Sequence, residues 1–134
     1  KSTPRPFRWW SEDPAALVEM GWRHREGKGL EQSDALAVVY YRRAAIKGDP
    51  AGEDSFGWML KTGRGVARDD LEAVRLFRLS AEAGFTQGMF NLALMLRDGR
   101  GVEAPDLQAA ILWLQRASEN GHISSAGLLA QLSP

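Results

Sequence analysis

Glycines recur in this sequence at a fixed interval of 36 residues, and no other feature constrains the fold as strongly. The interval separates Gly27, Gly63 and Gly99 and, two positions further on, Gly29, Gly65 and Gly101. The segments around these glycines also match, because 57–84 repeats the pattern of 21–48 and 93–121 repeats it again. A period of this length is typical of a solenoid, in which supersecondary units stack on one another. We therefore expect three copies of one structural unit.

Each copy predicts two helices joined by a glycine turn. A glycine after a helical segment can adopt the left-handed backbone conformation that ends a helix. Asp13 and Asp69 are typical N-caps, and we expect Pro14 and Pro105 in the first turns of their helices. The expected helices span about 14–26, 52–62, 69–83, 87–98 and 124–132, together with one from residue 33 or 34 to 47 and one from residue 105 or 106 to 120. No strand is expected, so the predicted fold class is all-α: an α-solenoid of about three antiparallel helix-turn-helix repeats with a C-terminal capping helix.

The predicted domain covers most of the chain. It spans 14–134, with repeats at about 14–50, 51–86 and 87–123 and the capping helix at 124–133. Residues 1–13 are expected to form an extended arm, because Pro4 and Pro6 favour extended backbone before them. The aromatic side chains of this arm either cover the first repeat as a cap or dock onto a partner or a membrane surface. The chain begins at Lys1 rather than Met, which leaves open what precedes it.

Composition excludes several classes of partner and site. Seventeen basic and seventeen acidic residues cancel, so no long-range field favours nucleic acid or an anionic membrane. The absence of cysteine excludes disulfides and thiolate metal sites but leaves the compartment open. No apolar run approaches the roughly 20 residues of a membrane-spanning helix. The sequence does not determine the oligomeric state.

Small residues at matched positions predict close packing between helices. On the first helices they are Gly21, Gly57 and Ala93, and on the second helices Ala44, Ser80 and Ala117. Small side chains let helix backbones approach each other, and large apolar neighbours such as Phe56 and Phe77 fill the remaining space. A single helix pair could not bury its apolar faces alone, so neighbouring repeats must stack.

The repeated pattern resembles the Sel-one-like repeat family, which is related to the tetratricopeptide repeats. The matching features are a small residue four positions before a large apolar one, as in Gly52 and Phe56, the G-x-G-V turns at 63–66 and 99–102, and the A-A-x-x-G ending at 44–48. The resemblance covers about 14–133 and departs locally, for example at Glu53, where the other copies have Leu17 and Met89.

The resemblance implies a right-handed superhelix that binds other proteins, commonly as an adaptor, scaffold or regulator in bacterial envelope or signalling systems. It favours an exported or periplasmic location slightly over the cytoplasm. It also implies that the first helices line a concave side, where residues at i, i+4 and i+7 share one stripe. That stripe comprises Val18, Trp22, Arg25, Asp54, Trp58, Lys61, Phe90, Leu94 and Arg97. An apolar row would thus run beside an exposed basic row. Alternatively, the tryptophans pack between helices and the basic residues interact with helix dipoles.

Residues that could support catalysis are sparse. His24 and His122 are the only histidines, and we expect each to be packed or solvated. No spacing suggests a metal site, an activated nucleophile or a carboxylate pair. The basic residues in the glycine turns, Lys28, Arg64 and Arg100, are expected to be solvated.

We therefore predict a noncatalytic interaction module without a cofactor, which holds an apolar or acidic segment of a partner protein in the concave groove. Blocking a partner enzyme would be one form of this role. The alternative is a binder or hydrolase of a small molecule or a cell-wall fragment.

Overall fold

The computed structural model describes residues 12–132, and this part of the chain is all-helical, as predicted. It contains the helices α1 (Pro14–Glu26), α2 (Asp34–Ile46), α3 (Pro50–Thr62), α4 (Asp70–Glu82), α5 (Thr86–Asp98), α6 (Leu107–Glu119) and α7 (Ile123–Leu132), and no strand. The predicted N-terminal arm lies outside the described residues except for its last two positions.

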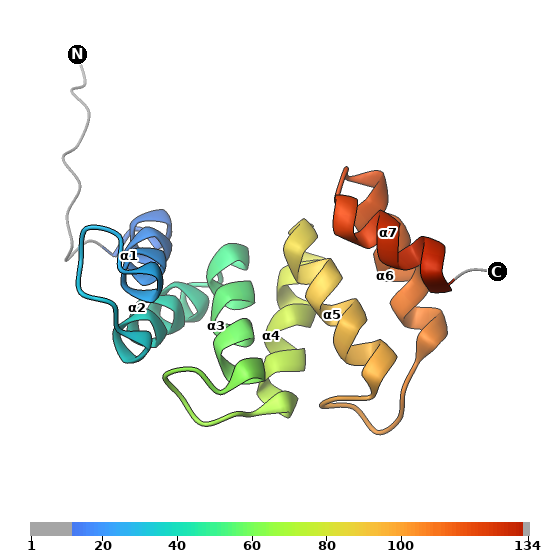
Figure 1. Ribbon diagram of the computed structural model, residues 1–134, viewed down its shortest axis with the longest axis horizontal. Helices are drawn as coiled ribbons and strands as arrows, with labels where there is room; N and C mark the ends of the chain where they lie inside the picture. Colours follow the sequence, from blue (N-terminus) through green and yellow to red (C-terminus); the bar gives the residue numbers. More distant parts are fainter. Residues whose placement is uncertain (1–11, 133–134) are drawn as a thin grey trace, which may run out of the picture.

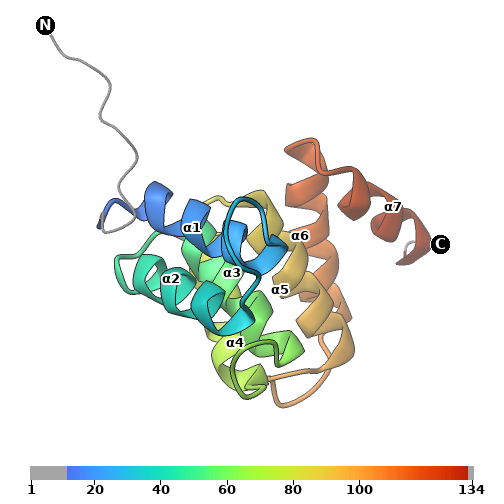
Figure 2. The ribbon, with the colours of Figure 1, turned by 60° about the vertical axis from the view of Figure 1, so that its left-hand side comes forward.

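The helices form a curved row that follows the order of the chain (Figures 1 and 2). Each helix packs on the next one along the chain, and α7 packs on α6 at the C-terminal end. In addition, α1 contacts α3 and α3 contacts α5, whereas the second helices of the described repeats make no comparable contacts with one another. Because the first helices approach each other more closely, they lie on the inner side of the curve.

Helix boundaries agree with the predicted ones to within about two residues, with one instructive difference at α6. Pro105 was expected in the first turn, but α6 begins at Leu107 and Pro105 precedes the helix. Asp106 is the N-cap instead, because its side chain accepts a hydrogen bond from the backbone N–H of Ala109 at 3.0 Å. Nine positions separate Gly101 from Ala110, whereas eight separate Gly65 from Ala73, and this loop accommodates the extra residue. The proline therefore lies in the loop and the aspartate starts the helix.

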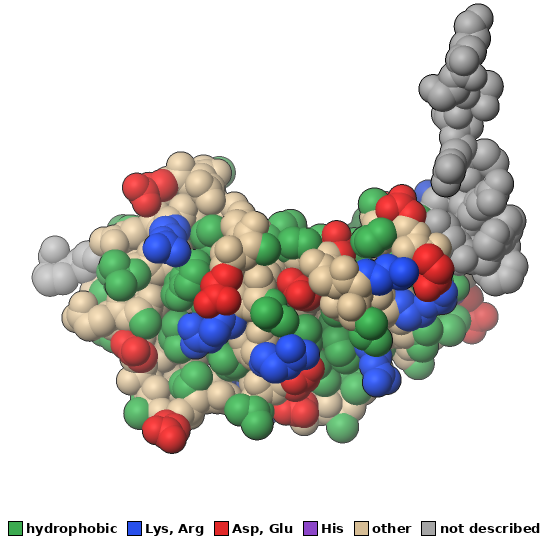
Figure 3. Space-filling view, turned by 180° about the vertical axis from the view of Figure 1, so that it is seen from behind, with side chains coloured by type: hydrophobic (Ala, Val, Ile, Leu, Met, Phe, Trp, Pro, Cys, Tyr) green, Lys and Arg blue, Asp and Glu red, His purple; other side chains and the backbone are tan. Residues whose placement is uncertain are grey.

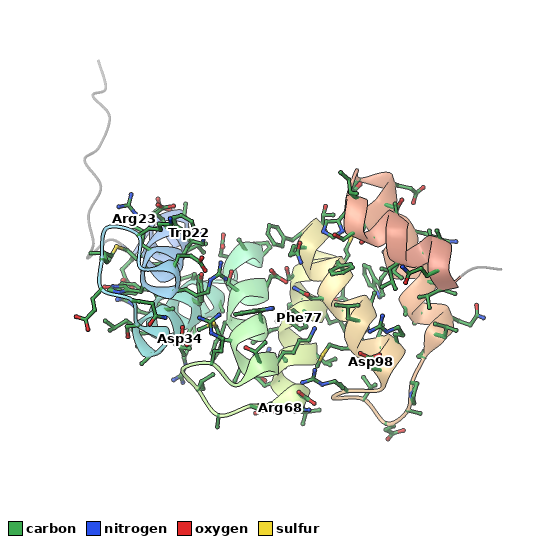
Figure 4. All side chains as sticks on the ribbon, viewed as in Figure 1. Trp22, Arg23, Asp34, Arg68, Phe77 and Asp98 are labelled. Atoms are coloured by element: carbon green, nitrogen blue, oxygen red, sulfur yellow. The ribbon has the colours of Figure 1, made fainter. Side chains whose placement is uncertain are left out.

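Close helix packing depends on the predicted small residues. A Cβ atom at Gly57 of α3 would lie 2.8 Å from the ring of Phe77 on α4, which is too close for any side chain there. Phe77 is fully buried in the middle of the molecule (Figure 4). Around it, one continuous apolar cluster runs from α3 to α6 and includes Leu92, Met95 and Leu114. Burial of this apolar surface is the main stabilising contribution, and it couples neighbouring repeats.

None of the seven helices in the described part of the chain is both long and apolar enough to cross a bilayer.

Candidate functional site

The predicted stripe lies on the three first helices, but its members differ in how far they reach solvent. Trp22 on α1, labelled in Figure 4, is exposed, with 39% of its surface accessible. Asp54 on α3 is buried at 7%. The remaining members are half-buried: Val18, Arg25, Trp58, Lys61, Phe90, Leu94 and Arg97. Most side chains of the stripe are therefore partly buried, and the stripe is not uniformly exposed to solvent.

Trp58 lies at the centre of this surface and is flanked by two arginines. The guanidinium carbon of Arg25 lies 5.5 Å from the ring centroid of Trp58, and that of Arg64 lies 5.3 Å away. These distances are within the range of cation–π attraction. Arg25 comes from α1 and Arg64 from the turn after α3, so the indole is held where the first two repeats meet.

A hollow of about 460 Å³ opens beside Trp58. Its lining combines the two arginines with polar side chains and consists of Arg25, Glu26, Asp54, Ser55, Trp58, Arg64, Gln87 and Asn91. On its floor, the side-chain amide of Asn91 on α5 donates a hydrogen bond of 2.7 Å to the Asp54 carboxylate. Burial raises the pKa of Asp54 to about 6, although the hydrogen bond from Asn91 and the charge of Lys61 act against this rise. The hollow is thus lined on one side by the Trp58 ring and two arginines, and it contains a carboxyl group, Asp54, whose pKa is about 6.

The basic row is less exposed than the sequence suggested. Lys61 is half-buried, and burial together with the nearby charge of Arg100 lowers its pKa. Arg97 forms an ion pair of 2.8 Å with Asp98, a residue labelled at the end of α5 in Figure 4, and Arg25 forms one of 3.1 Å with Glu26. For Lys61 the reason is that the last turn of α3 faces the third repeat, where Arg97, Asp98 and Arg100 lie. Of this row, Arg25 is the member that reaches Trp58.

The expectation that the basic residues of the glycine turns are solvated is wrong for two of the three. Arg64 donates two hydrogen bonds to Asp34, with the shorter at 2.7 Å, and Arg100 does the same with Asp70. Each pair joins a turn to the second helix of the preceding repeat. Hydrogen bonds from Arg100 and from Arg68 hold the pKa of Asp70 well below its usual range. One sequence signal could have revealed these pairs, since both the arginines and the aspartates are 36 residues apart.

Both histidines are packed, as expected. His24 is buried, donates from Nδ1 to the Glu31 carbonyl at 3.0 Å and stacks on Tyr40. His122 accepts from the Ser125 hydroxyl at 2.7 Å and from the Ser125 backbone N–H at 3.1 Å, so it fixes the start of α7. Within residues 12–132, no group of three or more acidic or histidine side chains could hold a metal ion.

Charges of both signs are mixed with apolar side chains over the face shown in Figure 3. This distribution agrees with the balanced net charge and gives no basic surface for a polyanion on that face.

Comparisons with known proteins agree with the repeat pattern. The family model described as Sel1 repeat matches residues 14–49, 56–85 and 86–122. Among solved structures, a protective antigen of uropathogenic Escherichia coli strains that displays an SLR fold superimposes with a TM-score of 0.83 at 34% identity over 89% of this chain. A Sel1 repeat protein from Oxalobacter formigenes gives 0.80 at 24% identity over 88% of the chain. Helicobacter pylori cysteine-rich protein B gives 0.63 at 17% identity over 91%.

The chain spans 25% of the E. coli protein, 48% of the Oxalobacter protein and all of the Helicobacter protein. The two structures below 25% identity establish the fold alone. No curated protein matches the chain.

Proposed function

Because the chain belongs to the Sel1 repeat family, whose members are commonly protein-interaction modules, we propose that it is a noncatalytic module that binds a segment of a partner protein on its inner face. Residues of the predicted stripe would make the contact, with the hollow beside Trp58 at its centre. The observation that supports this site best is the half-buried indole of Trp58 held between Arg25 and Arg64.

This arrangement suits a partner segment that carries an apolar residue next to an acidic one. Tryptophan and arginine are the residue types that most often dominate the binding energy of protein interfaces. The neighbouring repeats already hold the Trp58 ring in place, so little side-chain entropy is lost when a partner binds. The Arg25 guanidinium would attract a carboxylate of the partner, and Trp22 would extend the apolar contact along α1.

Capture of a partner from the native cell, followed by binding measurements with two variants, tests this proposal. Arg25→Glu reverses the charge beside Trp58 and should weaken binding at least tenfold, with a smaller dependence on salt. Lys28→Glu makes the same charge change in an exposed turn and should leave the affinity unchanged. Equal affinities for the two variants would exclude this surface as the site.

The polar lining of the hollow also favours a second candidate function. A volume of about 460 Å³ lies within the usual range of small-molecule sites, and Asp54, Asn91 and Gln87 offer hydrogen-bonding groups there. The chain would then bind a small molecule or a cell-wall fragment. Saturating amounts of such a ligand should raise the melting temperature of the protein without any partner protein, and Asn91→Ala should reduce that rise.

We also propose an exported or periplasmic location. The similarity to a bacterial protective antigen supports it, and detection of the protein in cell fractions would test it.

A further inference from the structure

Glu53 interrupts the repeat at a position that is otherwise apolar. Residues 17, 53 and 89 are separated by the repeat interval, and Leu17 and Met89 are 0% and 6% exposed at the equivalent places. Glu53 is buried to the same degree, at 6%, on the first turn of α3. A carboxylate at a core position usually has a partner, because an unpaired buried charge is costly.

The Glu53 carboxylate has no hydrogen bond or ion pair with any described residue. At the same time, residues 12–132 contain no side-chain oxygen or nitrogen that is fully enclosed without a hydrogen-bond partner. The carboxylate must therefore reach open space. That space is a hollow of about 500 Å³ between α2, α3 and α4, in whose lining Glu53 takes part.

The charged groups around the hollow compensate Glu53 only in part, because the charge of Arg75 lowers its pKa by less than burial and Asp49 raise it. Arg75 on α4 is engaged by Glu72 through two hydrogen bonds of 2.8 and 2.7 Å. Arg42 on α2 lines the hollow, but it is exposed and forms no ion pair with the described residues. The Asp49 carboxylate is held as the N-cap of α3. Burial, followed by repulsion from Asp49, raises the pKa of Glu53. The ionised carboxylate is therefore unfavourable in this place, and a cation that entered the hollow would stabilise it.

The rest of the lining is apolar, and part of it is exposed. Ile46 on α2 is 75% exposed and Leu79 on α4 is 40% exposed, whereas Phe56 is half-buried and Leu76 is buried at 2%. An alkyl chain that ends in a positive charge matches this combination, because its methylene groups would cover the apolar wall while its head reaches Glu53. A lysine side chain is such a group, and its compact ammonium needs only one carboxylate.

We propose that this hollow, on the side of the molecule away from the inner groove, receives a lysine side chain of a partner protein, with Glu53 as the acceptor of its ammonium group. The site is separate from the surface around Trp58, and its test does not depend on that surface.

Titration of the isotope-labelled protein with n-butylammonium tests the proposal, because this probe reproduces the end of a lysine side chain. The backbone amide signals of residues that line the hollow on α2, α3 and α4 should shift, and n-butanol, which has no charge, should shift them at least fivefold less at the same concentration. Glu53→Gln should weaken butylammonium binding at least fivefold. Glu82→Gln removes one exposed negative charge from α4 and should have no effect.

Glu53→Met restores the residue type of the third repeat, and it should abolish butylammonium binding while it raises the melting temperature. This variant keeps the test valid even if the glutamine variant folds poorly. Signals that shift equally in wild type and Glu53→Gln would overturn the proposal. Tighter binding of n-butylguanidinium than of n-butylammonium would overturn the assignment to lysine.

Discussion

Two junctions join the three repeats. Both are held by the same kind of ion pair, but their inner surfaces differ. At the first junction Arg64 binds Asp34, and at the second Arg100 binds Asp70, in each case through two hydrogen bonds. The second junction has more charged contacts. Arg100 also donates to the Lys61 carbonyl at 2.9 Å, and Asp70 also accepts from Arg68, labelled at the turn before α4 in Figure 4, whereas Asp34 accepts from the neutral Gln32 at the same place.

The inner surfaces of the two junctions differ in chemistry. The first places Arg25 against Trp58, whereas the second buries the hydrogen bond between Asp54 and Asn91. The ion pairs between repeats recur at both junctions, whereas the contact of Arg25 with Trp58 and the hydrogen bond of Asn91 with Asp54 each occur at one junction. The proposed partner contact therefore rests on the inner residues that differ between the junctions, not on the ion pairs that both junctions share.

The largest expected effect comes from breaking a junction at its turn. Gly65 has a φ of +70°, and a methyl group there would overlap the Asp34 carbonyl and lie 2.9 Å from the backbone nitrogen of Ala35. Gly65→Ala should lower the free energy of unfolding by about 4 kcal/mol, the sum of left-handed strain and overpacking. Gly101→Ala should do the same at the second junction, where the methyl group would overlap the Asp70 carbonyl.

Gly63→Ala is the matched control for this prediction, measured by the same denaturant unfolding. Its φ of +71° imposes the same backbone strain, but the nearest atom to an added methyl group is the Cβ of Arg68 at 3.4 Å. The control should therefore cost about 1 kcal/mol. Similar losses for Gly63→Ala and Gly65→Ala would show that the turn does not pack tightly against α2.

The buried pair at the second junction should make stability depend on pH. The pKa of Asp54 is raised from 3.8 to about 6, so its favourable contribution is complete below pH 3.8 and is lost as the pH rises through about 6. A shift of roughly two units corresponds to about 3 kcal/mol. Asp54→Asn should remove this loss, and the variant should be the more stable protein at pH 8 but not at pH 4.

Denaturant unfolding between pH 4 and pH 8, together with the carboxyl carbon signal of Asp54, measures this effect. Glu53 titrates in the same direction, so only the difference between wild type and Asp54→Asn isolates Asp54. If the free energy of unfolding changed with pH equally in wild type and Asp54→Asn, the Asp54 carboxylate would be well hydrated.

The sequence predicted the fold because the fold depends on local backbone preferences repeated in phase. The turn glycines, the caps and the small residue at 57 each have a conformational or steric consequence that no neighbour can change much. The prediction that Pro105 lies in the first turn of α6 was wrong, because two signals for a helix start are adjacent there. The proline favours a first-turn position, but the side chain of Asp106, one residue later, caps the helix.

The site was less predictable, because it depends on the angle between repeats and on side-chain conformations. Sequence spacing placed Arg25 and Trp58 on the same inner stripe, but it could not show that Arg64 completes the arrangement from a turn. Nor could it show that Lys61 is half-buried, since its burial comes from the following repeat. Glu53 was visible as a departure from the pattern, but the hollow it faces is formed by three helices together.

The smallest expected effect compares the two ion pairs that fasten the junctions. Asp70→Asn should lower the free energy of unfolding by about 1 kcal/mol and Asp34→Asn by about half as much, because partly exposed ion pairs are weak and Asp70 has two arginine partners. The pKa of each aspartate is lowered, chiefly by hydrogen bonds from arginine, so each contribution is present above the unfolded-state value and is lost as the pH falls through the folded-state value. The two variants should consequently differ at pH 7 and converge toward wild type in acid. Equal losses at pH 7 would mean that the additional contacts of Arg68 and Arg100 do not strengthen the second junction.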